Sequence, residues 1–227
     1  MEPMEREPVR VVALASGGVE SAVLLKELLA EGHTVIPCYV KAGFSWEPQE
    51  QRALERVLEA LAHERLEEIA LLNLPVDDCY KEHWSLTGRA VPDAASPDGA
   101  VELPGRNLLL LSKAAVYAAV CGADAIAIGP LKDNPFPDAT PAFFAAMAEA
   151  VSQATGRRLA ILTPLAHLKK AEVLKRAREV VPLELTFSCI APVGGLHCGG
   201  CNKCAERRRG FSLAGIVDPT QYAASLA

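Results

Sequence analysis

The stretch from Val9 to Leu25, VRVVALASGGVESAVLL, decides the fold of this chain. Its first part, up to Leu14, is a short apolar run rich in β-branched residues, which is typical of a parallel strand buried on both faces. Ser16, Gly17 and Gly18 follow, and glycines let the backbone turn tightly and a ligand approach closely. The apolar residues that come next recur at helical spacing, namely Ala22, Leu24, Leu25, Leu28 and Leu29.

This strand, glycine turn and helix together favour a phosphate-binding loop. The first N–H groups of the helix lack intrahelical partners and point, with the positive end of the helix dipole, towards an anion. The loop is not a Walker motif, because no Gly-Lys-Ser/Thr closes it, and it is not the G-x-G-x-x-G turn of dinucleotide-binding proteins. A purely structural turn is the alternative for this stretch taken alone.

Length, composition and charge narrow the class of protein. The 227 residues suffice for one domain, or one domain with a small appended lobe, and a hydrophobic content of 50% supports a large core. A net charge of -5 disfavours a protein that coats long nucleic acid and fits a small anionic ligand better. Because no apolar run could span a bilayer and the N-terminal MEPMEREP is polar and acidic, we expect a cytoplasmic protein without a membrane partner.

Apolar, strand-like runs alternate with amphipathic helical patterns along the chain. Glu67 and Glu68, which lie in the third of the expected strands, also suit the end of a helix. The alternation predicts an α/β fold with a doubly wound parallel sheet. Strands are expected at residues 9–14, 33–40, 66–72, 123–129 and 157–162, and the later helices at residues 47–61, 108–120, 143–154 and 169–180.

Several segments stand where open α/β sheets bind ligands, outside the carboxyl ends of strands. Residues 73–104 carry little regular pattern, so we expect a substrate lid or edge there, with disorder as the alternative. Residues 131–141, LKDNPFPDATP, form a second expected ligand loop. Arg106 and Asn107 begin an apolar helix, where a cation and an amide could meet phosphate or a ring edge, although Asn107 could instead simply cap the helix.

Four cysteines near the C-terminus form the pattern C-x8-C-x2-C-x2-C. Four cysteine sulfurs suit a closed tetrahedral zinc site, which is structural because no position is open for water. Free thiols and an iron–sulfur cluster are the alternatives. His197 could replace one thiolate, but we expect it beside the metal site or exposed. The expected ligands are Cys189, Cys198, Cys201 and Cys204.

The remaining cysteines and a run of arginines receive simpler interpretations. Cys38, Cys79 and Cys121 are expected to fill buried positions rather than act as nucleophiles. Residues 207–209, three consecutive arginines, are expected on a solvated helix face, with a contact to phosphate or a partner subunit as the alternative. One of Lys169 and Lys170 could reach a phosphate group.

The residues from Ser16 to Ser21, SGGVES, resemble the S-G-G-x-D-S pyrophosphate loop of ATP pyrophosphatases, with Glu20 where that motif has Asp. Such enzymes split ATP into AMP and pyrophosphate while they activate a substrate oxygen. Together with further motifs in the same order, the chain resembles the 7-cyano-7-deazaguanine synthase family over nearly its whole length. Those motifs are Pro104-Gly105-Arg106-Asn107, Pro137-Asp138, Thr163-Pro164-Leu165 with Lys170, the four cysteines, and Arg209-Gly210-Phe211.

This resemblance implies both a fold and a reaction. The fold is the five-stranded parallel sheet of adenine-nucleotide hydrolases, with an ATP-binding α/β domain at residues 1–185 and a zinc-bearing C-terminal lobe at residues 186–227. The reaction is the ATP-dependent conversion of 7-carboxy-7-deazaguanine and ammonia, through an adenylated intermediate, into 7-cyano-7-deazaguanine, a queuosine precursor. The chain would then be a carbon–nitrogen ligase, and the sequence leaves a homodimer open.

The resemblance also implies roles for single residues. Glu20 is the candidate Mg²⁺ ligand and, with Lys170, a candidate catalytic residue. Arg106, Asn107 and Asp138 are candidate substrate contacts, although Asp138 could be an ordinary turn carboxylate. The residues expected to hold ATP are Ser16, Gly17, Gly18, Val19, Glu20 and Ser21.

Three departures from the family pattern lie near the expected ligand site. They are Glu20 itself, Ala139-Thr140 where the family has Cys-Arg, and residues 48–53, PQEQRA, where the family has a Tyr-Gly-Gln-Arg-His stretch. These departures leave two alternatives open. The chain could be a related ATP pyrophosphatase that adenylates another carboxylate or a tRNA base, or a nucleotide-binding relative without turnover.

Overall fold

The five predicted strands form one parallel sheet in the order β3-β2-β1-β4-β5. The computed structural model describes residues 8–223, so most of the acidic N-terminal segment lies outside the described residues. The doubly wound α/β fold is therefore confirmed. The strands are β1 (Arg10–Leu14), β2 (Thr34–Lys41), β3 (Ala70–Asn73), β4 (Ala125–Ala127) and β5 (Ala160–Leu162).

Strand β3 differs from the strand that the sequence predicts at residues 66–72. Leu66 makes only an isolated bridge with Val35, and the chain rejoins β2 at Ala70. Between these points the Glu67 side chain turns to Arg10, with Nη2 and Oε2 2.6 Å apart. This ion pair holds the segment at the edge of the sheet, so regular pairing begins later than the apolar pattern suggests.

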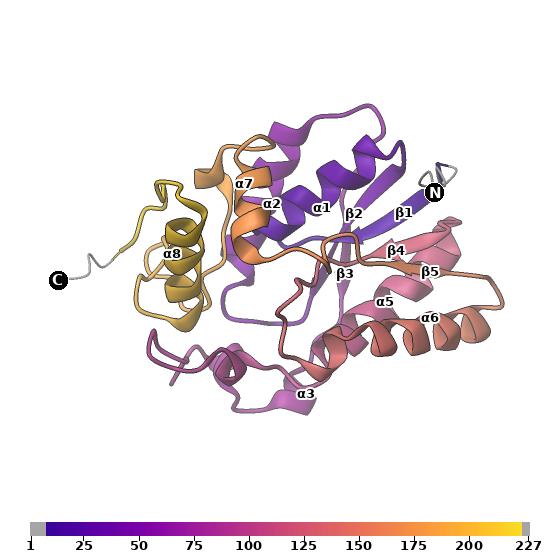
Figure 1. Cartoon of the computed structure of the whole chain (residues 1–227). Helices are drawn as coiled ribbons and strands as arrows, with labels where there is room; N and C mark the ends of the chain where they lie inside the picture. Colours follow the sequence, from indigo (N-terminus) through magenta and orange to yellow (C-terminus); the bar gives the residue numbers. More distant parts are fainter. Residues whose placement is uncertain (1–7, 224–227) are drawn as a thin grey trace.

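Helices cover both faces of the sheet (Figure 1). Val11 and Ala13 of β1 belong to one buried cluster and Val12 and Leu14 to another, as expected when side chains alternate between two covered faces. The first cluster holds residues of α1 (Val19–Ala30), α2 (Glu47–Leu61) and α7 (Lys170–Ala177). The second holds residues of α5 (Arg106–Cys121) and α6 (Pro141–Thr155).

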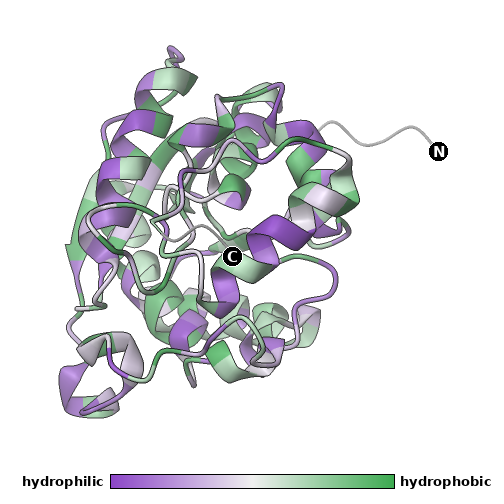
Figure 2. Ribbon diagram, turned by 90° about the vertical axis from the view of Figure 1, so that its left-hand side faces the viewer, coloured by the Kyte–Doolittle hydropathy of each residue, from purple (hydrophilic) through white to green (hydrophobic). Residues whose placement is uncertain are grey.

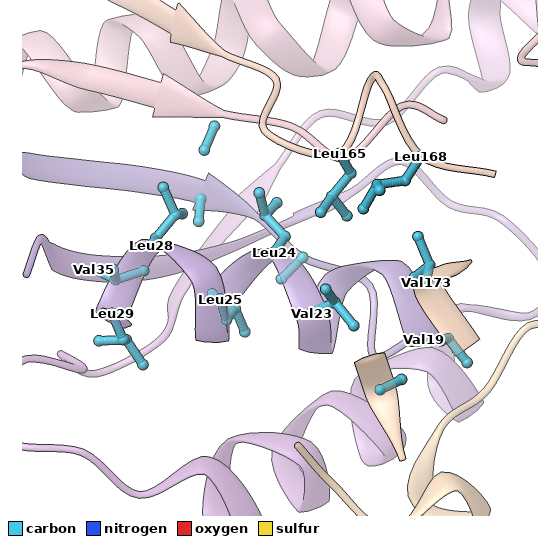
Figure 3. Packing of buried hydrophobic residues seen from close by; sticks show 14 of the residues in the cluster. Val19, Val23, Leu24, Leu25, Leu28, Leu29, Val35, Leu165, Leu168 and Val173 are labelled. Atoms are coloured by element: carbon cyan, nitrogen blue, oxygen red, sulfur yellow. The ribbon is translucent and has the colours of Figure 1, made fainter. Parts of the chain in front are cut away.

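Helix α1 is apolar on more than one side because two layers cover it. Leu24, Leu25 and Leu28 are almost wholly buried, and Figure 3 shows them between the sheet and the other packed elements, with Leu165 and Val173 nearby. Helices α2 and α7 are more clearly amphipathic, and Figure 2 shows hydrophilic and hydrophobic residues on the same helices. No helix among residues 8–223 has the length and apolar character needed to cross a membrane.

Residues 74–105 are ordered, so disorder is the wrong interpretation of this long excursion. It contains α3 (Asp77–Tyr80), α4 (Trp84–Thr87) and the 3-10 turn η1 (Asp98–Val101). Backbone hydrogen bonds tie it to the cysteine-rich segment, because Asn202 N donates to Pro92 O at 2.9 Å and Ala94 N donates to Gly200 O at 2.9 Å.

Helix α8 (Asn202–Ala214) lies beside α7 (Figure 1), after the 3-10 turn η3 (Leu183–Leu185). Arg207 on α8 is buried, which corrects the expectation of a solvated face. Its Nε donates to Thr220 Oγ1 at 2.6 Å and its Nη2 donates to Leu183 O at 3.1 Å. Because Leu183 precedes residue 185, this contact crosses the predicted domain boundary, and that boundary stays a prediction.

Of the other two arginines of the run, Arg208 is half-buried and Arg209 is exposed as expected, and each has a partner. The Arg208 guanidinium lies 3.8 Å from the centre of the Tyr222 ring. Arg209 pairs with Asp98 of η1, with Nη2 and Oδ1 3.1 Å apart. The run therefore helps to attach α8 to the segments around it.

Gly17 allows the loop after β1 to rest directly on α2. Its φ is +75°, and a Cβ atom built there would lie 2.5 Å from Leu54 N and 2.9 Å from Glu50 O. These neighbours are backbone atoms of a helix, so they cannot move aside cheaply. Only glycine fits this position, both in its conformation and in its space.

Replacing Gly17 by alanine should lower the free energy of unfolding by about 2 to 5 kcal/mol, because left-handed strain and overpacking add. Gly156 is the matched control, since its φ is +64° but a Cβ there would meet nothing within 4 Å. Gly156→Ala should cost only the conformational term, about 1 to 2 kcal/mol. Urea denaturation of the two variants measures both changes, and equal losses would contradict the close approach to α2.

Candidate active site

A cavity of about 550 Å³ opens at the carboxyl ends of β1, β2 and β4. This is the edge of the sheet at which open α/β proteins bind ligands. Gly17 and Val19 do not line the cavity, because Gly17 faces α2 and Val19 is in the core. The other predicted site residues outside the cysteine group do line it, namely Ser16, Gly18, Glu20, Ser21, Arg106, Asn107, Asp138 and Lys170.

The phosphate-binding loop (residues 16–21) is closed by hydrogen bonds within itself. Ser16 N donates to Ser21 Oγ at 2.9 Å, and the two serine hydroxyls lie 3.4 Å apart. Helix α1 begins at Val19 with Gly18 at its N-cap, and no side chain accepts a hydrogen bond from the free N–H groups there. The start of α1 therefore offers uncapped donors, which suit an anionic ligand.

Lys170 brings three helices together at one end of the cavity. Its Nζ donates to Glu20 Oε1 of α1 and lies 3.6 Å from Glu206 Oε1 of α8. Burial alone would lower the pKa of Lys170, but Glu20 and Glu206 outweigh this and raise it. Lys170 therefore remains a cation inside the cavity, next to the phosphate-binding loop.

Glu206 is a residue of this group that the sequence interpretation missed. Burial would raise its pKa, but Lys170 and Lys203 lower it to about 2, so the carboxylate is ionised. Nothing in the local sequence distinguishes Glu206 from an ordinary charged residue of α8. Only the packing of α8 on α7 brings it to Lys170.

Helix α2 contributes two further acidic side chains that the sequence interpretation did not select. Glu47 accepts hydrogen bonds from Ala42 N at 2.6 Å and Gly43 N at 3.1 Å, and thereby holds the chain that leaves β2. Glu50 accepts a hydrogen bond from Tyr39 Oη at 2.9 Å. Burial raises the pKa of Glu50 to about 7, although Arg106 and the Tyr39 hydrogen bond act in the opposite direction.

Aromatic rings form another wall of the cavity, here called the aromatic wall. Phe44 stacks on Trp46 with ring centres 4.9 Å apart, and Trp46 stacks on Trp84 of α4 with centres 5.7 Å apart. All three rings line the cavity. Flat apolar faces of this kind suit a planar heterocycle. Phe44 and Trp46 directly follow β2, which is a signal that the sequence contained.

Asn107 and Asp138 bind each other. Asp138 Oδ2 accepts from Asn107 N at 2.8 Å, and Asn107 Nδ2 donates to Asp138 O at 3.0 Å. Gly105 occupies the N-cap of α5, so the alternative in which Asn107 simply caps its helix is wrong. The loop at residues 131–141 is thereby attached to α5 through the 3-10 turn η2 (Pro137–Ala139).

Arg106 lies beside this pair and lines the cavity. Among residues 8–223, no carboxylate oxygen lies within 4.0 Å of its guanidinium. A half-buried guanidinium without a carboxylate partner can receive an anionic ligand group. Arg106 therefore keeps its predicted place at the site, and its role as a substrate contact stays a prediction.

The four C-terminal cysteines converge. Their sulfur atoms all lie within 4.8 Å of one another, with Cys189 and Cys201 3.8 Å apart and Cys198 and Cys204 3.9 Å apart. A tetrahedron with metal–sulfur bonds of about 2.3 Å places its sulfurs about 3.8 Å apart, so the group fits a metal ion of that size. Backbone N–H groups point at the sulfurs as well, since Cys198 N donates to Cys189 Sγ at 3.2 Å.

His197 and the other cysteines lie outside this group. His197 is buried, its Nε2 accepts from Ser188 N at 3.2 Å, and burial lowers its pKa to about 4. Cys38 is a buried filler as predicted, and burial raises its pKa to about 12. Cys121 is half-buried. Cys79 is exposed, so the prediction that it fills a buried position is wrong.

Replacing Asp138 by alanine should lower the free energy of unfolding by about 1 to 2 kcal/mol, because the N–H of Asn107 loses its acceptor. Asp133→Ala is the matched control, since Asp133 is exposed in the same loop. It should change the free energy by less than about 0.5 kcal/mol. Chemical denaturation measures both, and an Asp138→Ala variant as stable as the control would refute the contact.

Comparison with known proteins identifies the family. The model of the family described as queuosine biosynthesis protein QueC matches residues 10–215. A 7-cyano-7-deazaguanine synthase of Methanothrix thermoacetophila is 34% identical, over 94% of this chain and 98% of that protein. One of Saccharolobus solfataricus is 33% identical, but the match covers 96% of this chain and only 48% of the longer relative.

A solved structure supports the fold alone. The U34-tRNA thiolase NcsA from Methanococcus maripaludis, which carries a [4Fe-4S] cluster, superposes with a TM-score of 0.51 at 15% identity, over 96% of this chain and 76% of the other. The sequence identity to the Methanothrix synthase is 34%, against 15% to the thiolase. The chain therefore belongs to the QueC family of queuosine biosynthesis proteins.

Proposed function

We propose that this protein converts 7-carboxy-7-deazaguanine and ammonia into 7-cyano-7-deazaguanine with ATP, through an adenylated carboxylate. One observation carries the proposal, which is that a single cavity joins the uncapped start of α1 and Lys170 to Arg106 and the aromatic wall. A phosphate-binding end and a flat apolar end in one cavity suit a reaction between ATP and a planar heterocyclic acid. The names of the relatives support the same product.

The chemistry explains why both ends are needed. A carboxylate resists attack by ammonia because its leaving group is poor, so its oxygen must first be joined to AMP while pyrophosphate leaves. This step needs positioned reactants and stabilised phosphate charge rather than a covalent nucleophile. The amide that ammonia forms can be activated by a second ATP and dehydrated to the nitrile.

The loop and Lys170 supply the phosphate-binding end. The N–H groups at the start of α1 and the hydroxyls of Ser16 and Ser21 would hold the departing pyrophosphate, with Lys170 as a fixed cation. Glu20, whose carboxylate lines the cavity at the same end, would hold the Mg²⁺ that accompanies ATP. Bound Mg²⁺ neutralises charge on the phosphates. Glu20 would then share its carboxylate between Mg²⁺ and Lys170.

The other end would hold the substrate acid. Arg106 is the cation available to its carboxylate, and the aromatic wall would cover the faces of the deazaguanine ring. Asp138 and Asn107 border the same space, and Asp138 would accept from the amino and imino groups of the ring with whatever acceptor capacity its bonds to Asn107 leave.

The direct test incubates purified protein with Mg-ATP, ammonium and 7-carboxy-7-deazaguanine and follows AMP, pyrophosphate and product mass together. Nitrile with AMP is the expected result. Lys170→Met should lose AMP formation by about 10²-fold or more, because a charge-assisted phosphate contact is removed. Lys175→Met is the matched control, since Lys175 is exposed on the same helix and lines no part of the cavity.

The alternatives from the sequence give different results in this test. AMP without nitrile would indicate an ATP pyrophosphatase with another acceptor. No AMP from a folded protein would indicate a nucleotide-binding relative without turnover.

We also propose that the cysteine group holds structural Zn²⁺, because four thiolates leave no open position. Metal analysis should give one zinc per chain, and Cys198→Ser should lose it and lower the free energy of unfolding by several kcal/mol. Cys79→Ser, at an exposed cysteine outside the group, should keep both metal and stability. Iron with visible absorption in the purified protein would instead indicate a cluster.

A further inference from the structure

Glu50 stands between the phosphate-binding loop and the aromatic wall. Its backbone carbonyl lies against Gly17, and its side chain lines the cavity together with Trp46. This position is on the first turns of α2, directly after the carboxyl end of β2. The functions assigned above to ATP, Mg²⁺ and the substrate acid do not use this carboxylate.

Two side chains donate hydrogen bonds to the Glu50 carboxylate. Oε2 accepts from Tyr39 Oη at 2.9 Å, and the Trp46 side chain is the second donor. A carboxylate offers about four acceptor positions, so capacity for a cationic ligand remains. Glu47, one turn earlier, uses its Oε1 to hold Ala42 N and Gly43 N, whereas Glu50 holds no backbone group.

The surroundings of the Glu50 carboxylate suit a small cation. The stacked rings of Phe44 and Trp46 line the same cavity as Glu50. Aromatic faces attract ammonium groups. The charged and titratable groups that act on Glu50 are Tyr39 from β2, Glu47 from α2 and Arg106 from α5. Of these only Arg106 is a cation, and an anionic substrate that pairs with it would reduce its repulsion of ammonium.

We propose that Glu50 binds ammonium and removes a proton from it, so that ammonia attacks the adenylated carboxylate. This inference rests on the proposed function and adds to it the site of the nitrogen donor. The requirement is chemical, because ammonium has no lone pair and is the main form of ammonia in neutral water.

The step balances as follows. One N–H bond of ammonium breaks and an O–H bond forms on Glu50, which leaves ammonia with its lone pair. That nitrogen forms a C–N bond to the acyl carbon, the C–O bond to AMP breaks, and the electron pair leaves on the phosphate oxygen of AMP. The nitrogen releases its second surplus proton to water in the open cavity, and the products are the amide and AMP.

The pKa of Glu50 agrees with this role. Burial raises it to about 7, which is close to the pH at which a general base is both ionised and able to hold a proton. The carboxylate must be ionised to accept a proton. Amide formation should therefore fall as the pH drops below about 7.

The test compares wild type with Glu50→Gln, which keeps the shape of the side chain and loses the base. Pyrophosphate release with 7-carboxy-7-deazaguanine in the absence of ammonium should stay within about twofold of wild type. Amide formation from ammonium at neutral pH should fall by about 10²-fold or more. Glu55→Gln is the matched control, because Glu55 is exposed on the same helix.

Hydroxylamine separates proton removal from any other role. It is a much weaker base than ammonia and is uncharged near neutral pH, so it needs no deprotonation before attack. Glu50→Gln should form the hydroxamate at close to the wild-type rate, and raising the pH should partly restore its reaction with ammonium. Glu50→Asp should recover part of the activity, because it restores the carboxylate.

Three results would overturn the inference. Loss of pyrophosphate release in a folded Glu50→Gln protein would make Glu50 a contact for ATP or the acid, and equal losses with ammonium and hydroxylamine would make it a shaping residue. Undiminished amide formation would exclude any role. A wild-type protein that releases no pyrophosphate would instead refute the proposed function, which is a distinct outcome.

Discussion

At Gly17 the phosphate-binding loop and helix α2 meet through backbone atoms alone, and much of the site depends on this approach. A side chain there would overlap Leu54 N. The contact fixes where α2 begins relative to β1, and therefore where Glu47 and Glu50 lie. The next residue, Gly18, is the N-cap of α1 and has no side chain to cap it, so the start of α1 is uncapped where it borders the cavity. Two neighbouring glycines thus set the position of α2 and leave the first N–H groups of α1 free.

Charge holds the end of the cavity beside the loop at residues 16–21 together. Lys170 of α7 lies between Glu20 of α1 and Glu206 of α8, so a single cation connects the loop, the sheet-covering helix and the cysteine-rich segment. A buried lysine between two carboxylates remains charged and its side chain stays in place. Because α8 starts directly after Cys201, the cysteine group is mechanically linked to the end of the cavity at which Lys170 lies.

The cavity combines groups whose chemistry differs along its length. Lys170 and the free N–H groups of α1 lie at one end, the aromatic wall and Arg106 lie at the other, and the half-buried carboxylate of Glu50 lines the same cavity. In the proposed reaction the bond between the acyl group and AMP connects the ligand at one end of the cavity to the ligand at the other end. Ammonia attacks the carbon of that bond, so a base for ammonium is needed between the two ends.

The sequence by itself determined the parallel α/β fold, the phosphate-binding loop and the cysteine group, because each depends on local periodicity or on the spacing of a few neighbouring residues. The tertiary structure decided those features that depend on contacts between residues far apart in the sequence. Arg207 is buried although its run of arginines suggests solvent, Glu206 reaches Lys170 only through the packing of α8 on α7, and Asp138 binds Asn107 across 31 positions. Glu50 likewise became visible only when α2 was placed against Gly17, since a glutamate on an amphipathic helix carries no mark of the cavity it will face.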